Sequence, residues 1–379
     1  MKFSILQHNV YFSFFIYSFS IGSFFPRIGD LQLKMNIGES ILGLALMGLP
    51  LGVQISLIIA DKILQIFGIR LVMCLGIPVI GISLIFSALS NNPFLFFFSL
   101  TIGGLAVGSI EVALNLEADR VEYRTSQRIM NRSHSFWSLG FVFSGLIGAI
   151  LSQLNVSPII HFALSFLFCS FLTIYFFNKY IPSPIRPNTS SNSKVFIIPT
   201  KAILALVVFT FSGMLIEGAG IEWSIIFMRD IYSTPSFING LAFILGALSQ
   251  FIVRFFADDF IENYGPVNIS RISIIMMFTG VLIVFVSSMP YIALLGFTLM
   301  GGGTAVIFPL AMSAAAQKTD RPAAVNVASL AQISFLVFLI GPPLLGFIAE
   351  NYGIRFSFGI SLPLLILSWM FINTLKVKE

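Results

Sequence analysis

The sequence is poor in charge, cysteine and histidine. Charged residues make up only 10% of the 379 positions, with two cysteines and three histidines. A chain this long with so few charges does not fit the soluble globular class. Cys74 and Cys169 fall in different apolar segments without metal-ligand spacing, which argues against a disulfide framework and a metal site. The three histidines form no His-Glu-x-x-His motif, which argues against a membrane enzyme, and no cofactor is expected.

Hydrophobic residues are abundant instead. They make up 57% of the chain, with a mean hydropathy of +0.95 and 42 phenylalanines. A bilayer crossing needs about 20 mostly apolar residues. The pattern predicts an all-α membrane protein, embedded in a lipid bilayer, that crosses it twelve times. The expected crossings are 5–28, 40–60, 71–90, 94–118, 132–153, 157–178, 202–227, 238–257, 270–288, 291–313, 325–348 and 356–375.

The basic residues predict the orientation. The first segment lacks a small-residue cleavage site and is therefore interpreted as a helix and not as a signal peptide. With both termini inside, only Arg27, Lys34, Arg229 and Arg355 of the 21 lysines and arginines fall outside. This asymmetry predicts cytoplasmic termini by the positive-inside rule. No basic-aromatic interleaving indicates a nucleic-acid partner.

A polar stretch near the midpoint divides the chain. Residues 179–194, "KYIPSPIRPNTSSNSK", are rich in proline, serine and asparagine. They predict a cytoplasmic linker, 179–201, between six-helix halves at 1–178 and 202–379. Segment 43–68 also aligns without gaps on segment 240–265, and both begin Gly-Leu-Ala and contain Ala-Asp before an aromatic-Gly ending. The halves are therefore interpreted as pseudo-symmetric repeats with a substrate path between them.

The segment "ADKILQIFGIR" resembles the loop signature of the major facilitator superfamily. Asp61, Lys62, Gly68 and Arg70 match its acid, base, glycine and final base, which implies a gate latch. The glycine usually found four residues before the acid is Leu57 here, which puts the closest helix approach in doubt.

The second half has a related pair of charges. Arg254 and Asp258 lie one helical turn apart, and this spacing predicts that they pair along one helix face as part of the gate. Simple solvation of charges at the membrane boundary and direct contact with substrate are the alternatives to a latch for both groups.

A narrower resemblance is to the fucose permease branch, including its uncharacterised bacterial inner-membrane members. It is carried by "EVALN" and "RIMNRSHSFWSLG", which place Glu111, Asn115, Arg128, His134 and Gly140 at matching positions. The resemblance implies a bacterial inner-membrane protein that couples sugar uptake to protons. Two departures stand out: His134 replaces an amide, and the first helix lacks the permease's membrane-embedded acid.

Glu111 is an acid in an otherwise apolar segment. An ionised carboxylate facing lipid costs about 2.5–3.5 kcal/mol on insertion scales, so Glu111 is expected to face a cavity or a partner. Asn115, at i+4, lies on the same face and suits substrate hydroxyls or an interhelical hydrogen bond. Glu111 is interpreted either as a proton-coupling or substrate site or as a structural partner of an arginine in 120–132.

Further polar residues are candidates for a central site. His134 is either a packing residue or a substrate contact, and Gln332 is its repeat counterpart at an offset of 198. Glu217 and Glu222 lie about 140° apart around one helix, so they are not expected to share a cavity. Glu217 is the second proton-coupling candidate, whereas Glu222 is expected to pair with Arg229 or cap the cavity.

Other motifs are assigned to structure. Trp223 is interpreted as a membrane-interface anchor or as a stacking surface for a sugar ring. The glycine runs lack the context of a phosphate loop and indicate close helix packing. The segment "GPPLLG" at 341–346 is expected to kink its helix.

The leading functional hypothesis is a monomeric secondary transporter that imports a small hydrophilic, sugar-like solute together with protons. Proton-coupled export of a metabolite or drug is the alternative, because direction is not encoded in the sequence. A non-transporting sensor is a minor alternative, and such a protein typically carries an added soluble domain.

Overall fold

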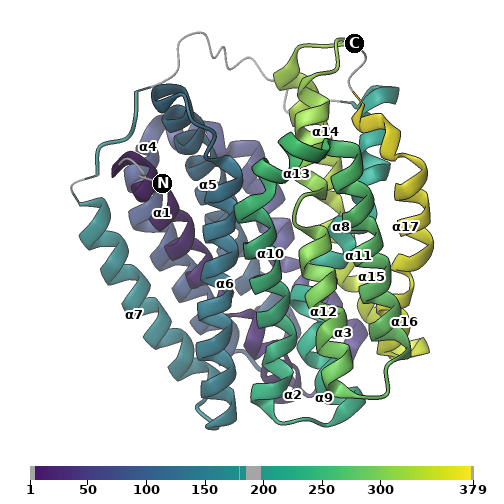
Figure 1. Ribbon diagram of the computed structural model, residues 1–379. Coiled ribbons are helices and arrows are strands. Elements are labelled where there is room, and N and C mark those ends of the chain that lie inside the picture. Colours follow the sequence, from purple (N-terminus) through teal and green to yellow (C-terminus); the bar gives the residue numbers. More distant parts are fainter. Residues whose placement is uncertain (1–4, 179, 185–197, 377–379) are drawn as a thin grey trace.

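Every regular element of the described chain is a helix (Figure 1). The computed structural model describes residues 5–178, 180–184 and 198–376. Most of the predicted linker, 179–201, lies outside the described residues. Within the described residues, ten helices are long and apolar enough to cross a membrane, and the first and last crossings are built from shorter helices. The prediction of an all-α protein with twelve crossings in two pseudo-symmetric halves is confirmed.

In the first half, one labelled helix spans two crossings and several crossings are broken into pieces. The elements are α1 (Ile5–Gly22), η1 (Phe25–Arg27), α2 (Ile28–Met35), α3 (Glu39–Leu46), α4 (Gly48–Leu89), α5 (Pro93–Thr125), α6 (Met130–Gln153) and α7 (Pro158–Phe177). Helices α5 and α7 begin with side-chain caps. The side chains of Asn92 and Ser157 accept hydrogen bonds from backbone N–H groups in the first turns of these helices.

The second half repeats this arrangement. Its elements are α8 (Lys201–Glu222), α9 (Ser224–Tyr232), α10 (Ser236–Tyr264), α11 (Pro266–Val286), α12 (Pro290–Thr304), α13 (Ile307–Ala316), α14 (Ala323–Ser334), α15 (Leu336–Tyr352), α16 (Ile354–Gly359), α17 (Ser361–Met370) and η2 (Ile372–Leu375). In Figure 1 the blue and purple helices of the first half stand beside the green and yellow helices of the second.

Two glycines at equivalent repeat positions end their helices in the same way. Gly68 has φ 68° and ψ 164°, and Gly265 has φ 78° and ψ 156°. A residue with a β-carbon is strained at such positive φ values, so glycine is required where the chain reverses between crossings. The sequence repeat is therefore also a repeat of backbone geometry.

The expected kink at "GPPLLG" stays a prediction, and a separate break is found earlier in this crossing. The helix break lies at Phe335, between α14 and α15, and α15 continues through Pro342 and Pro343. These prolines lack the N–H groups that would bond the carbonyl oxygens of Phe338 and Leu339 in a regular α-helix. Packing by neighbouring helices holds the segment helical, but two carbonyl groups lose their usual donors.

The two halves are in close contact at the end of the bundle opposite the linker, called here the far end. A β-carbon at Gly43 of α3 would overlap the carbonyl oxygen of Pro342 in α15. Arg229 of α9 donates to Gln32 at 2.8 Å, and the Ser40 amide donates to Glu350 at 2.7 Å. The far end is therefore closed in this conformation.

At the opposite end, called the linker end, carboxylates accept hydrogen bonds from the described residues on both sides of the linker. Glu117 is 2% exposed and accepts hydrogen bonds of 2.8 Å from the Tyr180 hydroxyl and the Ser183 amide. Across the second half, Asp320 accepts a hydrogen bond from the Thr200 hydroxyl. The connection is thus attached to both halves by side chains outside the apolar crossings.

The hydrogen bond between Thr200 and Asp320 is expected to depend on pH. Hydrogen bonds from Thr200 and Asn326 lower the pKa of its carboxyl, so the contact is fully present above the ordinary pKa and is lost as the pH falls through the lowered value. In Asp320→Ala we expect faster amide hydrogen exchange at 198–203 at pH 7, with the difference from wild type disappearing at pH 2–3. An unchanged exchange rate at pH 7 would contradict the assignment.

Candidate functional site

The centre of the site is a buried ion pair within the second half. Arg254 of α10 lies 3.1 Å from Glu217 of α8, and the two side chains are 9% and 14% exposed. Gln250, one turn before Arg254, donates to the same carboxylate oxygen at 2.6 Å. Charges removed from water need such partners, because breaking a buried pair leaves an uncompensated charge that costs several kcal/mol.

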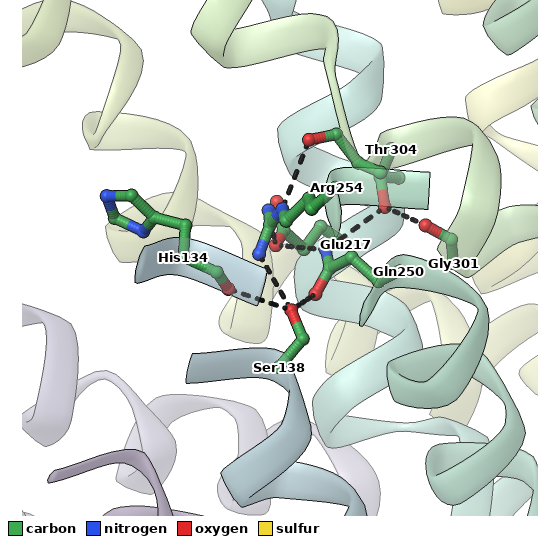
Figure 2. Close-up of polar contacts among 8 residues, drawn as sticks. His134, Ser138, Glu217, Gln250, Arg254, Gly301 and Thr304 are labelled. Atoms are coloured by element: carbon green, nitrogen blue, oxygen red, sulfur yellow. Dashed lines mark hydrogen bonds and ion pairs between the residues drawn. The ribbon is translucent and has the colours of Figure 1, made fainter. Parts of the chain in front are cut away.

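Hydroxyl groups extend the ion pair toward both sides (Figure 2). Arg254 donates to the Ser138 hydroxyl of α6 at 3.1 Å and to the carbonyl oxygen of Ala305 at 3.1 Å. Gln250 also donates to the Thr304 hydroxyl at 3.4 Å. Ser138 belongs to the first half, so the guanidinium of Arg254 joins the two halves near their midpoint.

A second group of polar side chains lies in the first half. The Asn115 amide donates to the Glu111 carboxylate at 2.9 Å, and the imidazole Nε2 of His134 lies 3.1 Å from the Asn115 carbonyl oxygen. Because this oxygen only accepts, the geometry calls for a proton on Nε2. The Tyr17 hydroxyl also lies beside Glu111. The hydrogen-bond partners of the Glu111 carboxylate are thus neutral groups, and Arg254 is close enough to interact with it by charge.

The two groups are linked through a main-chain atom. Ser138 donates to the carbonyl oxygen of His134 at 3.3 Å and to the Gln250 side chain at 3.0 Å. Figure 2 shows the imidazole of His134 directed away from Ser138 and Arg254. The proximity of the groups is therefore set by the packing of α6 against α10.

A small, partly open cavity adjoins the ion pair. It is lined by Glu217, Gln250 and Thr304, with Phe141 of the first half and Phe243 and Phe297 among its aromatic walls. Aromatic and apolar walls with a few convergent polar groups are typical of a small-molecule site.

A second cavity lies on the opposite face of α8. Glu222 lines a very small space between α8 and α15, together with apolar residues and Phe338. Glu217 and Glu222 therefore line different cavities. Among the described residues, no group of three His, Cys, Asp or Glu side chains is placed to hold a metal ion.

Two predicted ion pairs are wrong. Arg254 does not pair with Asp258 but turns to Glu217, while Asp258 accepts a hydrogen bond from Asn131 of α6. Arg254 lies deep in its helix, where a carboxylate on α8 is the better partner. Asp258 lies one turn nearer the linker end. Arg254 therefore belongs to the central cluster, and it does not count as a boundary charge in the orientation argument.

The predicted pairing of Glu222 with Arg229 is also absent. Arg229 contacts Asp230 at 2.6 Å and donates to Gln32 across the far end. Trp223 is fully buried against Gly346, so its side chain is not an interface anchor. A chain turn at the α8–α9 junction places it inside the bundle.

The remaining candidates lie apart from the central cluster. Gln332 is partly buried in α14 and lines neither of the two cavities. Of the loop signature, Asp61 and Lys62 lie within α4, Gly68 makes the reversal, and Arg70 donates to Asn178 at 3.2 Å. Their predicted gate role remains a prediction.

Sequence reasoning missed three members of the cluster: Ser138, Gln250 and Thr304. Each is a small or neutral polar residue in an apolar crossing, and such residues are common in helix packing. Gln250 lies four residues before Arg254, and this i, i+4 spacing on one face was the available indication.

The fold is that of a membrane transporter of two six-helix bundles. The chain belongs to the Major Facilitator Superfamily, whose family model matches residues 10–223 and 205–378.

Relatives across most of the chain are also transporters. An uncharacterised transporter of Sinorhizobium fredii is 26% identical over 341 residues, covering 90% of each chain. An uncharacterised MFS-type transporter of Yersinia pestis is 24% identical over 361 residues, covering 95% of this chain and 93% of the relative. The chain is therefore similar to bacterial proteins named as transporters.

Solved structures share the fold. The D-xylose-proton symporter superimposes with a TM-score of 0.77 at 13% identity and covers 98% of each chain. The nucleoside transporter NupG superimposes with a TM-score of 0.71 at 14% identity, covering 99% of this chain and 100% of its own.

Proposed function

We propose that the protein imports a small hydrophilic, sugar-like solute by proton-coupled symport. The observation that carries the proposal is the Glu217–Arg254 ion pair of the second half, which reaches Ser138 of the first half and adjoins a cavity. The halves, 1–178 and 202–379, rock about this site in an alternating-access cycle, joined by the linker at 179–201. The linker end then faces the cytoplasm of a bacterial cell, with the protein working as a monomer in the inner membrane.

Glu111 is proposed as the proton carrier. Its carboxylate is bonded by Asn115 and lies beside Tyr17, so it can take up a proton without breaking an ion pair. Protonation of Glu217, in contrast, would remove the charge that pairs with Arg254. Protonation of Glu111 and release of Arg254 by substrate at Glu217 would therefore be separate events of one cycle.

The substrate class rests on the donor and acceptor set. Asn115, His134, Gln250 and Thr304 present amide, imidazole and hydroxyl groups suited to polyols. The resemblance to the fucose permease branch and the fold of the D-xylose-proton symporter support the same class.

The test is gradient-driven uptake in proteoliposomes screened with sugars and polyols. A gradient of one pH unit corresponds to about 1.4 kcal/mol and supports about tenfold accumulation when one proton moves per solute. We expect Glu111→Gln to lose this accumulation and to equilibrate the solute only, while retaining counterflow exchange.

The direction of proton movement relative to the solute is measured in the same vesicles. Symport predicts that solute entry carries protons into the lumen, whereas the exporter hypothesis predicts proton movement against the solute. Full accumulation by Glu111→Gln would remove Glu111 from the coupling mechanism. Asp259→Asn, which removes an exposed carboxylate of α10, is the matched control.

A further inference from the structure

Four side chains of the central cluster form a closed ring of hydrogen bonds, called here the polar ring (Figure 2). Arg254 donates to the Ser138 hydroxyl at 3.1 Å, and this hydroxyl donates to the Gln250 side-chain oxygen at 3.0 Å. The Gln250 amide nitrogen and Arg254 both donate to Oε1 of Glu217, at 2.6 Å and 3.1 Å. Three members belong to the second half, and Ser138 of α6 is the member from the first half.

Ser138 helps to set the orientation of the Gln250 amide. A guanidinium only donates, so the Ser138 oxygen accepts from Arg254 and its single hydrogen is free to reach the Gln250 oxygen. The amide nitrogen then faces the carboxylate of Glu217, which only accepts. With the opposite orientation, two oxygen atoms would face each other at hydrogen-bond distance and repel. Ser138 therefore keeps the donor of Gln250 directed at the carboxylate from the side of the first half.

The polar ring is shielded from water, so a missing member is not readily replaced. Ser138 is 0% exposed, Gln250 is 4% exposed and Arg254 is 8% exposed. Removal of the Ser138 hydroxyl would take one acceptor from Arg254 and one donor from Gln250 in this buried place. The cost of leaving such groups unsatisfied exceeds what a hydrogen bond contributes on average. The bonds of each member therefore depend on the presence of the others.

The polar ring lies in the middle of a close contact between α6 and α10. Nearer the linker end, Asn131 donates to Asp258 at 2.5 Å. Nearer the far end, a β-carbon at Gly240 would lie 2.5 Å from that of Ala149. Ser138 reaches its partners across this contact, so separation of the two helices by about 1 Å would open the ring.

Ser138 contacts the residues of the cavity and not the cavity itself. Glu217 and Gln250 line the cavity, and Ser138 is not among the residues that line it. A solute in the cavity would therefore meet the partners of Ser138. The hydroxyl acts on such a solute only through the side chains that it holds.

We propose that Ser138 is a positioning residue for the solute site. It holds Arg254 and Gln250 in place beside the carboxylate, so the site is complete only while α6 lies against α10. This inference rests on the proposed transport function and adds the way in which movement of the halves changes affinity. A solute shifts an equilibrium between two conformations only by its difference in affinity for them. Because affinity is highest when the two helices meet, solute binding favours closure of the halves around the site.

A double-mutant cycle tests the polar ring without any solute. Midpoints of thermal unfolding of the full-length protein are measured in detergent for Ser138→Ala, Gln250→Leu and the double variant. We expect the double variant to shift the midpoint by clearly less than the sum of the two single shifts, because either change opens the same ring.

Ser144→Ala is the matched control for this cycle. Ser144 is also fully buried in α6, and its hydroxyl donates to the carbonyl oxygen of Phe141 on the same helix at 3.2 Å. Combined with Gln250→Leu, this change is expected to give additive shifts.

Transport kinetics separate positioning from packing. The probes are D-xylose, D-glucose and sorbitol, and the assay is counterflow exchange in proteoliposomes. We expect Ser138→Ala to raise the concentration for half-maximal exchange by about three- to tenfold and to leave the maximal rate per folded protein near the wild-type value. Ser138→Thr keeps a hydroxyl and is expected to restore the wild-type concentration. If this variant does not fold, Ser138→Cys supplies a weaker donor and acceptor and is expected to give an intermediate value.

Three results would overturn the inference. They are additive shifts in the cycle of Ser138 with Gln250, a lower maximal rate with unchanged half-saturation in Ser138→Ala, and an equal rise in half-saturation in Ser144→Ala.

Failure of the proposed function would look different. If none of the three probes is exchanged by the wild type, the sugar-like substrate class is rejected, while the cycle still decides whether Ser138 positions Gln250. If Glu111→Gln retains full accumulation, proton coupling at Glu111 is rejected, and the rise in half-saturation in Ser138→Ala is still expected.

Discussion

Arg254→Gln is expected to abolish transport and to destabilise the protein by about 3–5 kcal/mol. The change leaves the Glu217 carboxylate without its cation, although Gln250 still donates to it. It also removes the donor that reaches Ser138 of the first half. The measurements are solute accumulation in proteoliposomes and the midpoint of thermal unfolding in detergent.

The double variant Glu217→Gln/Arg254→Gln separates stability from function. Removing both charges avoids the uncompensated carboxylate, so we expect most of the stability to return while transport stays absent. Recovery of transport in the double variant would show that the ion pair is only a packing element. Equal stability of the single variant and wild type would contradict the burial argument.

Gly43→Val is expected to open the far end. A β-carbon at this position would overlap the carbonyl oxygen of Pro342, and backbone atoms cannot move aside as a flexible side chain can. Overpacking of this kind costs about 1–3 kcal/mol. If the cost falls only on the closed state, the open state gains about 5- to 150-fold in population.

Spin labels at Leu154 and Tyr291 measure this shift. Both positions are exposed at the far end, one in each half, and Cys74 and Cys169 are replaced first. We expect the distance distribution to move to longer values in Gly43→Val. Leu44→Val, at an exposed position on the same helix, is the control and should keep the wild-type distribution.

The fold could be predicted from the sequence because its determinants are local. Apolar length gives the crossings, and the aligned repeat predicts that Gly68 and Gly265 share a role, which their matching backbone angles bear out. Glu111 and Asn115 lie four residues apart on one helix, so their shared face followed from helical geometry alone, and the structure joins them by a hydrogen bond.

The partners of Arg254 could not be predicted in the same way. Asp258 is the nearest carboxylate in sequence, whereas Glu217 is 37 positions away and becomes the partner only through the packing of α8 beside α10. A single sequence specifies which face a residue occupies but not which neighbouring helix meets that face. The same limit explains why Ser138 and Thr304 were missed.

Ser138 carries one hydroxyl hydrogen but has two acceptors within reach, the His134 carbonyl on its own helix and the Gln250 side chain on the other half. If α6 and α10 separate, the hydrogen can turn to the carbonyl, so the Ser138 hydroxyl keeps an acceptor. The Ser138 hydroxyl can therefore form and break its hydrogen bond to the other half and still have an acceptor in both positions of the two helices.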